Sequence, residues 1–532
     1  MTLSRRTVLK GGAAAVAAAA PGIRGAQAAS NTKILNAVMQ GDLRSFDPIW
    51  TTANITAYYG AMVYDTLFSM DAEFRPQPQM VGKWGSSEDK RTYTFELRDG
   101  LLWQDGTAVT AADCVASLRR WAVRNAGGQM MMEYLKDLSA KGDQTIVLAL
   151  KEPFGLVVPG LAALGTPECF MMRKKDAETD PFQQIQSHIG SGPFIFNQQA
   201  TRPGSRYVFD KYRKYVPRSE PASGLAGGKV VTLDRVIWEN IADDQTALAA
   251  LESGEIDFFE LPPLDLLPQL ESNPDLRIQV LNKLGNYGEL RMNCLYPPFD
   301  NEKARQAMLY LVSQEDVLKA NFGNPKYYHK VYSLFGHDTP MMNDANIGWF
   351  KAAPDPARAK QLFQEAGYQG EPVIVLQPSD FAFMNYAGQL IVSWLKKIGV
   401  NVHPAVSTWG GVVSRRAVMK PPSEGGWNIF TTYGTNYGFS NPITTVDLLA
   451  NGKKGWFGWP ENTEYEALRK QWALVPTLAE RQAIARKMQA LAWNFVPLVP
   501  LGQWVSPAAM RKNVHGVIGM PDIIPFWNVS KT

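Results

Sequence analysis

Apolar side chains along this chain follow two spacings that alternate with one another. Short apolar runs bounded by polar or turn residues are typical of strands. They lie at residues 34–39, 92–97, 236–239 and 256–260. Apolar residues three and four apart predict a helix over residues 53–68. Strands that alternate with helices along the chain predict an α/β fold.

Capping residues mark where several helices begin and end. Thr110, followed three residues later by Asp113, has the spacing of a capping box and predicts a helix start. Gly254 ends a helix predicted over residues 245–253, because glycine adopts the left-handed conformation at low cost. Residues 202–228 are rich in Pro, Gly and Ser and predict irregular surface structure.

The clearest unit lies between residues 355 and 441. An apolar strand at 373–376, a helix at 381–398 and a strand at 400–406 have the order of a parallel βαβ unit. A further strand is predicted at 428–432. Because ligands of open parallel sheets bind beyond the carboxyl ends of the strands, the loops that follow these strands are candidate ligand contacts.

The loop after the last of these strands is uncharged and rich in aromatic residues. It reads YGTNYGFSNP over residues 433–442. With the loops that begin at Gln377 and Ser407, it is predicted to lie at the ligand-binding edge of the sheet.

The first thirty residues carry the pattern of an export signal. Arg5 and Arg6 precede a short apolar run at residues 11–20, and Ala26 and Ala28 match the pattern that a signal peptidase cleaves. The paired arginines favour the twin-arginine route; an ordinary secretion signal is the alternative. No Cys occurs in or just after this segment. We therefore expect residues 1–28 to be removed and the mature chain to be periplasmic and not a lipoprotein.

Charge and hydropathy exclude two classes of partner. The chain has 54 Lys and Arg against 50 Asp and Glu, a net charge of +4. Residues 1–28 hold four basic residues and no acidic one, so the rest of the chain has 50 of each sign and is formally neutral. We therefore expect no nucleic-acid binding, and no later apolar run approaches the length of a membrane span.

Catalytic and metal-binding motifs are scarce. The sequence contains no G-x-S-x-G, H-E-x-x-H or P-loop pattern. The five histidines lack metal-ligand spacing, and Cys114, Cys169 and Cys294 are too scattered for a clustered zinc site or a disulfide scaffold. We expect no enzyme activity, no cofactor and no metal.

Six stretches, in order along the chain, form a recognisable signature. The first reads TYTFELRDG at residues 92–100, and the second reads WQDGT at 103–107. The others are TAADCVASLRR at 110–120, GSGPF at 190–194, AALESGEID at 249–257 and the stretch with RQA at 301–311. Together they resemble the peptide-type extracellular solute-binding proteins, family 5, which are receptors of peptide and nickel ABC importers. Only Cys114 departs from that pattern.

The resemblance implies a two-lobed α/β fold of the Venus-flytrap type, class II, with an extra third domain. Lobe I would consist of residues 31–75, 190–285 and 500–532, the extra domain of 76–189, and lobe II of 286–499. Crossings near residues 285 and 500 would form the hinge. Such a receptor is expected to be a monomer that closes on its ligand and is recognised by an ABC permease with ATPase subunits in the inner membrane.

The resemblance also implies nine ligand-binding positions. Trp409 and Arg416 match a tryptophan and an arginine that peptide-binding members use near the ligand, and an arginine there could hold a carboxylate through a bidentate hydrogen bond. Its neighbour Arg415 leaves the register open. The nine positions are Trp50, Thr51, Asn54, Trp409, Arg416, Tyr433, Thr435, Asn436 and Tyr437.

Asn436 occupies the position at which peptide-binding relatives have an Asp that pairs with the ligand's α-ammonium. An amide supplies no counter-charge. Either the ligand lacks a free α-amine, or another acid replaces the Asp; Asp380 and Glu424 are conceivable replacements.

Three functions are left open. The first is a receptor for short peptides or peptide-like amides. The second is a receptor of the same fold for a non-peptide solute, such as a sugar oligomer, an opine or a metal chelate. The third is a periplasmic hydrolase or chaperone on this scaffold, for which the sequence offers no nucleophile and base.

Overall fold

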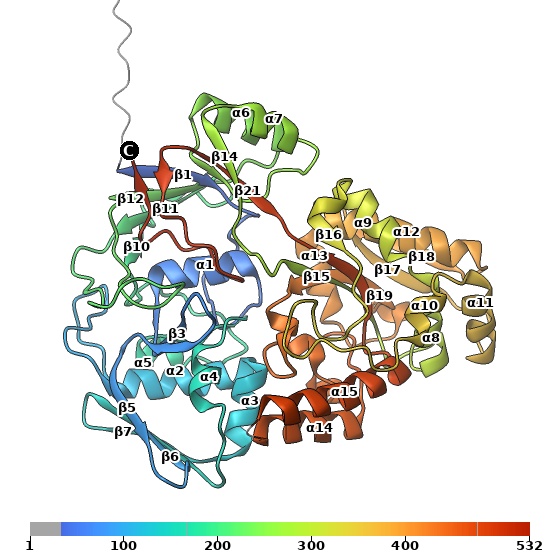
Figure 1. Cartoon of the computed structure of the whole chain (residues 1–532), viewed down its shortest axis with the longest axis horizontal. Coiled ribbons are helices and arrows are strands. Elements are labelled where there is room, and N and C mark those ends of the chain that lie inside the picture. The colour runs from blue at the N-terminus through green and yellow to red at the C-terminus, as the bar shows by residue number, and fades with distance from the viewer. Residues whose placement is uncertain (1–32, 166, 476) are drawn as a thin grey trace, which may run out of the picture.

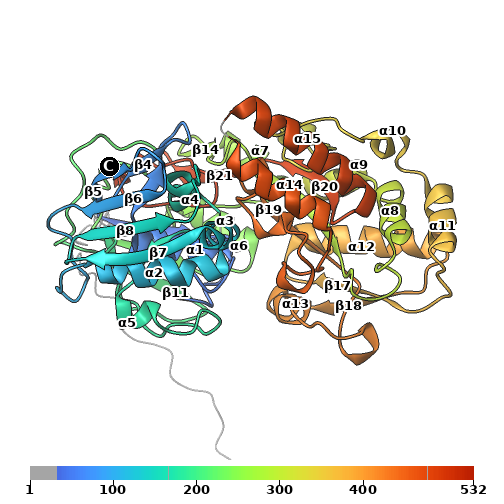
Figure 2. The ribbon, with the colours of Figure 1, turned by 90° about the horizontal axis from the view of Figure 1, so that it is seen from below.

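The chain folds into two lobes that lie side by side (Figure 1). The structure is a computed structural model that describes residues 33–165, 167–475 and 477–532. The blue-to-green part of the chain and its dark red last residues form one lobe, and the yellow-to-red part forms the other, as two perpendicular views show (Figures 1 and 2). The export signal predicted at residues 1–28 lies outside the described residues.

A seven-stranded mixed sheet forms the centre of the first lobe. Its order is β10–β11–β12–β1–β13–β21–β14, and β1 runs parallel to both β12 and β13. The strands are β1 (Ile34–Val38), β10 (Phe194–Phe196), β11 (Arg206–Lys211), β12 (Arg235–Glu239), β13 (Phe258–Phe259), β14 (Leu276–Val280) and β21 (Pro507–Arg511). The helices beside them are α1 (Asn54–Val63), α6 (Asp244–Ser253) and α7 (Leu267–Ser272).

A second, four-stranded antiparallel sheet in the same half of the molecule has the order β5–β6–β8–β7 (Figure 2). Its strands are β5 (Val81–Ser86), β6 (Thr92–Leu97), β7 (Leu135–Lys141) and β8 (Thr145–Leu150), and α2 (Ala111–Arg124) contacts β7 and β8. The capping box predicted at Thr110 is confirmed: its hydroxyl accepts a hydrogen bond from the Asp113 N–H, and the Asp113 carboxylate accepts one from the Thr110 N–H.

Shorter elements connect these two sheets. They are β2 (Asp65–Thr66), β3 (Phe68–Met70), β4 (Pro76–Pro78), α3 (Ala126–Glu133), α4 (Val157–Ala162), β9 (Phe170–Met171) and α5 (Lys174–Ala177). At the end of the chain, β22 (Val514–His515) pairs with β23 (Ser530–Lys531), and the segment between them, residues 516–529, packs on the first lobe. We call residues 516–529 the C-terminal segment.

The second lobe is built on a six-stranded sheet with the order β16–β20–β15–β19–β17–β18. The strands are β15 (Asn286–Met292), β16 (Tyr328–His329), β17 (Val373–Pro378), β18 (Val402–Ser407), β19 (Ile429–Thr435) and β20 (Val499–Trp504). The helices are α8 (Glu302–Leu311), α9 (Gln314–Phe322), α10 (Gly348–Ala352), α11 (Pro356–Glu365), α12 (Ala382–Lys397), α13 (Trp409–Arg416), α14 (Thr463–Leu474) and α15 (Leu478–Phe495).

The predicted parallel βαβ unit is confirmed. β17 lies parallel to β18, with Val373 opposite Val402, and α12 is the crossover between them. One face of α12 carries Phe383, Ala387 and Ile391 at four-residue spacing, and all three are buried. β19 runs parallel to β17 and ends at Thr435, three residues beyond the predicted end, so the first residues of the aromatic loop belong to the strand.

The chain passes between the two lobe sheets twice. The first crossing, residues 281–285, joins β14 to β15, and the second, Val505 and Ser506, joins β20 to β21. The second crossing comes later than residue 500, because β20 pairs with β15 and so belongs to the second lobe.

Two local predictions are wrong. The helix predicted over residues 53–68 ends at Val63, where the Gly192 N–H and the Gln104 side chain donate to the last carbonyl. The segment at 202–228 is not wholly irregular, because it contains β11, which pairs with β10 and β12. No helix in the described part of the chain combines the length and apolar character that crossing a bilayer requires.

Candidate functional site

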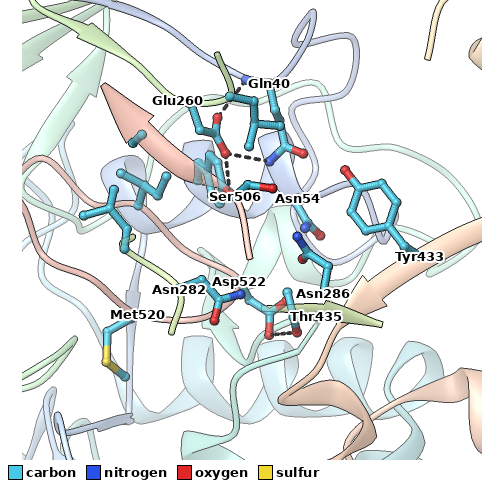
Figure 3. Close-up of a pocket in the computed structure, with 15 residues that line it drawn as sticks. Gln40, Asn54, Glu260, Asn282, Asn286, Tyr433, Thr435, Ser506, Met520 and Asp522 are labelled. Carbon is cyan, nitrogen blue, oxygen red and sulfur yellow. Dashed lines mark hydrogen bonds between the residues drawn. The ribbon is translucent and has the colours of Figure 1, made fainter. Parts of the chain in front are cut away.

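A cavity of about 60 Å³ lies between the lobes, next to both crossings (Figure 3). Its walls come from the first lobe, the second lobe, the crossings and the C-terminal segment. The lining residues are Gln40, Asn54, Tyr58, Glu260, Leu261, Leu281, Asn282, Asn286, Tyr433, Thr435, Ser506, Ala508, Met520, Asp522 and Ile524.

The first-lobe wall is set by the carboxyl ends of two neighbouring strands. Gln40 follows β1, and Glu260 follows β13, which runs parallel to β1. Asn54 and Tyr58 stand four residues apart on α1 and therefore share one face of that helix. The edge of the sheet and the helix together direct two amides, a phenol and a carboxylate into the cavity.

Glu260 is the buried acid of this wall, with 4% of its surface exposed. Its carboxylate accepts a hydrogen bond from the Tyr58 hydroxyl at 2.8 Å and from the Gln40 N–H at 2.7 Å. Burial raises the pKa of Glu260 to about 7, and these two hydrogen bonds oppose the rise without cancelling it.

The second-lobe wall lies where β15 begins and β19 ends. Asn286 and Thr435 are opposite one another in this antiparallel pair, and Tyr433 is two residues back on β19. Two-residue spacing puts Tyr433 and Thr435 on one face of the strand. The Thr435 hydroxyl donates a hydrogen bond of 2.8 Å to Asp522 of the C-terminal segment, so this contact joins the lobes.

Asp522 is a second buried acid, 7% exposed, with a left-handed backbone (φ 63°). Burial raises its pKa to about 6, against the lowering effect of the Thr435 hydroxyl. Glu168, 3% exposed, lies near enough for the charge of Asp522 to act on it, and burial followed by that charge raises the pKa of Glu168 to about 8.

The lining residues carry no positive charge. Among the described residues that form the walls there is no Lys, Arg or His, and neither Glu260 nor Asp522 has an ion-pair partner in the described part of the chain. Charge buried without a partner is costly, which is why both pKa values rise. A cation that enters the cavity therefore meets two carboxylates that lack counter-charge.

Three of the nine residues expected at the ligand line this cavity: Asn54, Tyr433 and Thr435. Asn436 does not, because its amide is fully buried inside the second lobe. Its Nδ2 donates to the His337 carbonyl at 2.7 Å, and its side chain packs against Gly336.

Tyr437 does not line the cavity either. Its ring stacks on Phe74 of the first half of the molecule, with ring centroids 5.5 Å apart, so it forms a contact across the lobes. The Trp50 indole donates to the Phe182 carbonyl at 2.9 Å, and the Thr51 hydroxyl accepts from the Ala53 N–H. Neither of these two residues lines the cavity.

Arg416 lies in an aromatic enclosure within the second lobe. Its guanidinium carbon is 4.8–5.7 Å from the ring centroids of Trp409, Phe430, Trp456 and Phe457. Burial lowers the pKa of Arg416 to about 10. Neither Arg416 nor Trp409 lines the cavity, and the ligand-binding roles of the residues outside it stay predictions.

The two acids considered as replacements for the missing Asp are exposed. Asp380 accepts a hydrogen bond from the Trp409 N–H at 2.6 Å, and neither Asp380 nor Glu424 lines the cavity. Glu260 could have been found from the sequence, because it ends a predicted strand and the carboxyl-end rule applies to it. Asp522 carried no such signal, because no predicted element surrounds it.

Comparisons with known proteins agree with this architecture. The model of the bacterial extracellular solute-binding proteins, family 5, matches residues 75–456. The chain is 50% identical, over all of both chains, to the probable peptide ABC transporter periplasmic-binding protein y4tO of Sinorhizobium fredii.

Solved structures share the fold at lower identity. DppA from Helicobacter pylori, in complex with the peptide STSA, is 21% identical, with a TM-score of 0.77 over 94% of this chain and 98% of that one. AgaA from A. tumefaciens R10, in complex with agropinic acid, is also 21% identical, with a TM-score of 0.76 over 94% and 99%. The two-lobed α/β architecture is thus that of periplasmic binding proteins, and this chain belongs to the extracellular solute-binding proteins of family 5.

Proposed function

We propose that this protein is the receptor of an ABC importer and that it captures a short peptide, or a peptide-like solute, between its lobes. Two similar proteins support this class of ligand: y4tO is named a probable peptide ABC transporter periplasmic-binding protein, and DppA is in complex with a peptide. The observation that carries the proposal is the cavity at the crossings, in which Glu260 and Asp522 are buried and no described Lys, Arg or His lines the walls. The α-ammonium of a peptide supplies the missing charge.

The rest of the lining suits a peptide backbone. Gln40, Asn54, Asn282 and Asn286 contribute four amides, and each amide has both donors and an acceptor for peptide N–H and C=O groups. In this account Glu260 and Asp522 take over the role of the Asp that Asn436 replaces. The ligand therefore has a free amine, which is one of the two alternatives that the Asn436 substitution left open.

Contacts across the lobes favour closure. They include the hydrogen bond from Thr435 to Asp522, the stack of Tyr437 on Phe74, and an ion pair of 2.7 Å between Lys470 and Glu133. A ligand that touches both walls adds contacts only when the lobes are closed, so it shifts the population toward the closed form. The crossings at 281–285 and 505–506 are the proposed hinge.

The remaining expectations complete the proposal. Residues 1–28 direct export by the twin-arginine route and are cleaved, and the mature protein is a monomer of the periplasm without a lipid anchor. It hands its ligand to a permease with ATPase subunits and does no chemistry on that ligand. We propose the boundaries expected above for lobe I, the extra domain and lobe II, with lobe II extended to residue 504, where β20 ends.

A non-peptide solute is the second candidate, because AgaA shares the fold and binds agropinic acid. The lining favours an amine over an acid, since it holds two carboxylates and, among the described residues, no cationic side chain for a ligand carboxylate. A sugar oligomer, or a metal chelate without net positive charge, would leave those carboxylates without counter-charge. A hydrolase or chaperone would require turnover or the binding of unfolded chains.

The test is the identity of the bound solute. Protein purified from its natural periplasm is examined by native mass spectrometry and then freed of solute by unfolding and refolding. We expect a copurified peptide or peptide-like amine, and a smaller radius of gyration in solution scattering when that solute is added back. A copurified sugar or metal chelate would overturn the peptide assignment, and an unchanged radius with tight binding would overturn closure.

A further inference from the structure

The two acids of the cavity are held at separate places. Glu260 is fixed to the first lobe by Tyr58 and Gln40, whereas Asp522 is fixed by Thr435 of the second lobe. In the view of Figure 3, the two carboxylates lie on opposite sides of the lining residues, with Asn54 and Asn286 between them. Each acid is therefore held by a different lobe, and we call the two acids the anionic ends of the cavity.

One ammonium group satisfies only one of these ends. The other acid would have to keep its proton, because an ionised carboxylate that is buried without counter-charge is costly. No described Lys, Arg or His lines the cavity to compensate. The same absence means that the described walls offer no counter-charge to a negatively charged group of the ligand.

We infer that the preferred ligand carries two separate positive charges, one for Glu260 and one for Asp522: a peptide whose first residue is Lys or Arg, or a diamine of similar length. That the ligand is a peptide rests on the proposed function. The inference goes beyond that function by naming the charge of the ligand's side chain. The carboxylate of such a peptide lies outside this cavity.

The experiment compares tripeptides that differ only in the first side chain. Lys-Ala-Ala, norleucine-Ala-Ala and Glu-Ala-Ala are titrated calorimetrically into protein freed of solute, together with 1,5-diaminopentane. Norleucine has the aliphatic chain of lysine without its charge, so the ratio of the first two affinities isolates the second cation. Losing one partner of a buried charge pair costs enough to predict a preference of about 30-fold or more for the lysine peptide.

Variants assign the preference to the two acids. Glu260→Gln and Asp522→Asn should each reduce the ratio of lysine to norleucine affinities by about 10-fold or more, because each leaves one anionic end. The matched control is Asp338→Asn, an exposed aspartate with the same left-handed backbone (φ 59°), which should leave the ratio unchanged. Circular dichroism and thermal melting verify that each variant is folded.

The outcomes separate this inference from the proposed function. Equal affinity for the lysine and norleucine peptides overturns the dication and leaves the peptide receptor standing. Binding of the diamine without binding of any peptide supports the dication and overturns the peptide receptor. Binding of none of the four probes, or tightest binding of the glutamate peptide, overturns both.

Discussion

Asp522→Asn should make the ligand-free protein more stable at neutral and alkaline pH. The folded state holds the Asp522 carboxyl at a pKa of about 6, above the ordinary value of 3.8, because burial disfavours the charged form. A carboxyl with a raised pKa contributes full stability below its unfolded pKa, and that stability is lost as the pH rises through its folded pKa. The asparagine keeps the shape of the protonated acid and never ionises.

The magnitude follows from the two pKa values. One pKa unit corresponds to about 1.4 kcal/mol. A rise of the Asp522 pKa from 3.8 to about 6 therefore means that the ionised carboxylate lowers the free energy of unfolding by about 3 kcal/mol at pH 8. At pH 4.5, where most Asp522 carboxyls are still protonated in the folded state, the loss of unfolding free energy is about 1 kcal/mol. The free energy of unfolding of the variant should therefore exceed that of the wild type by an amount that grows by about 2 kcal/mol between these pH values.

The assay is thermal unfolding followed by tryptophan fluorescence at pH 4.5 and 8, on protein freed of solute. With about 2.1 cal/mol/K of unfolding entropy per residue over about 500 residues, 3 kcal/mol corresponds to about 3 °C in melting temperature. Asp338→Asn is the control, because asparagine also suits the left-handed backbone at that exposed site. An Asp522 variant that melts at or below the wild-type temperature at pH 8 would refute the buried, uncompensated carboxylate.

Three further predictions test other parts of the account. Affinity for a free-amine peptide should rise between pH 6 and 8, because Glu260, whose pKa burial raises to about 7, must lose its proton to pair with an ammonium. Calorimetric titrations in two buffers of different ionisation enthalpy should show that binding releases a proton. An affinity that does not change with pH would contradict the pairing. Phe74→Asn removes the stack with Tyr437, and asparagine suits the backbone at φ 58°. Because such stacks contribute about 0.5–1.5 kcal/mol, calorimetry should show binding weakened about 2- to 13-fold although the cavity is untouched. An unaltered affinity would show that the stack does not contribute to closure. Replacement of both Arg5 and Arg6 by Lys should leave the precursor in the cytoplasm in cell fractionation, and unchanged export would show that the signal does not use the twin-arginine route.

Local signals account for the parts of the fold that the sequence predicts well. β6 covers the residues expected from the alternation at 92–97, and α2 begins where the capping box of Thr110 indicates. The βαβ unit around α12 follows from an apolar strand, a long apolar helix face and a second strand, all of which are contiguous in sequence. Each of these signals lies inside the element that it predicts.

Long-range contacts explain the parts that the sequence misses. α1 stops at Val63 because donors from Gln104 and Gly192 cap its last turn, and neither donor is near it in sequence. Asp522 enters the cavity only because the chain returns through β21 and lays the C-terminal segment against β19. The sequence offers Asp380 and Glu424 as replacements for the Asp that is missing at position 436, whereas the acids in the cavity come from elements that meet only after folding.

The charge of the ligand's amino terminus is the most direct test of the account. Protein freed of solute is titrated with one tripeptide in two forms, with a free α-amine and with that amine acetylated. If Glu260 and Asp522 provide the anionic walls of the binding site, the free form binds about 30-fold or more tightly than the acetylated form, and the difference shrinks when both acids are replaced by their amides. Equal affinities, or tighter binding of the acetylated peptide, would contradict the account, because the two buried carboxylates would then have no part in binding.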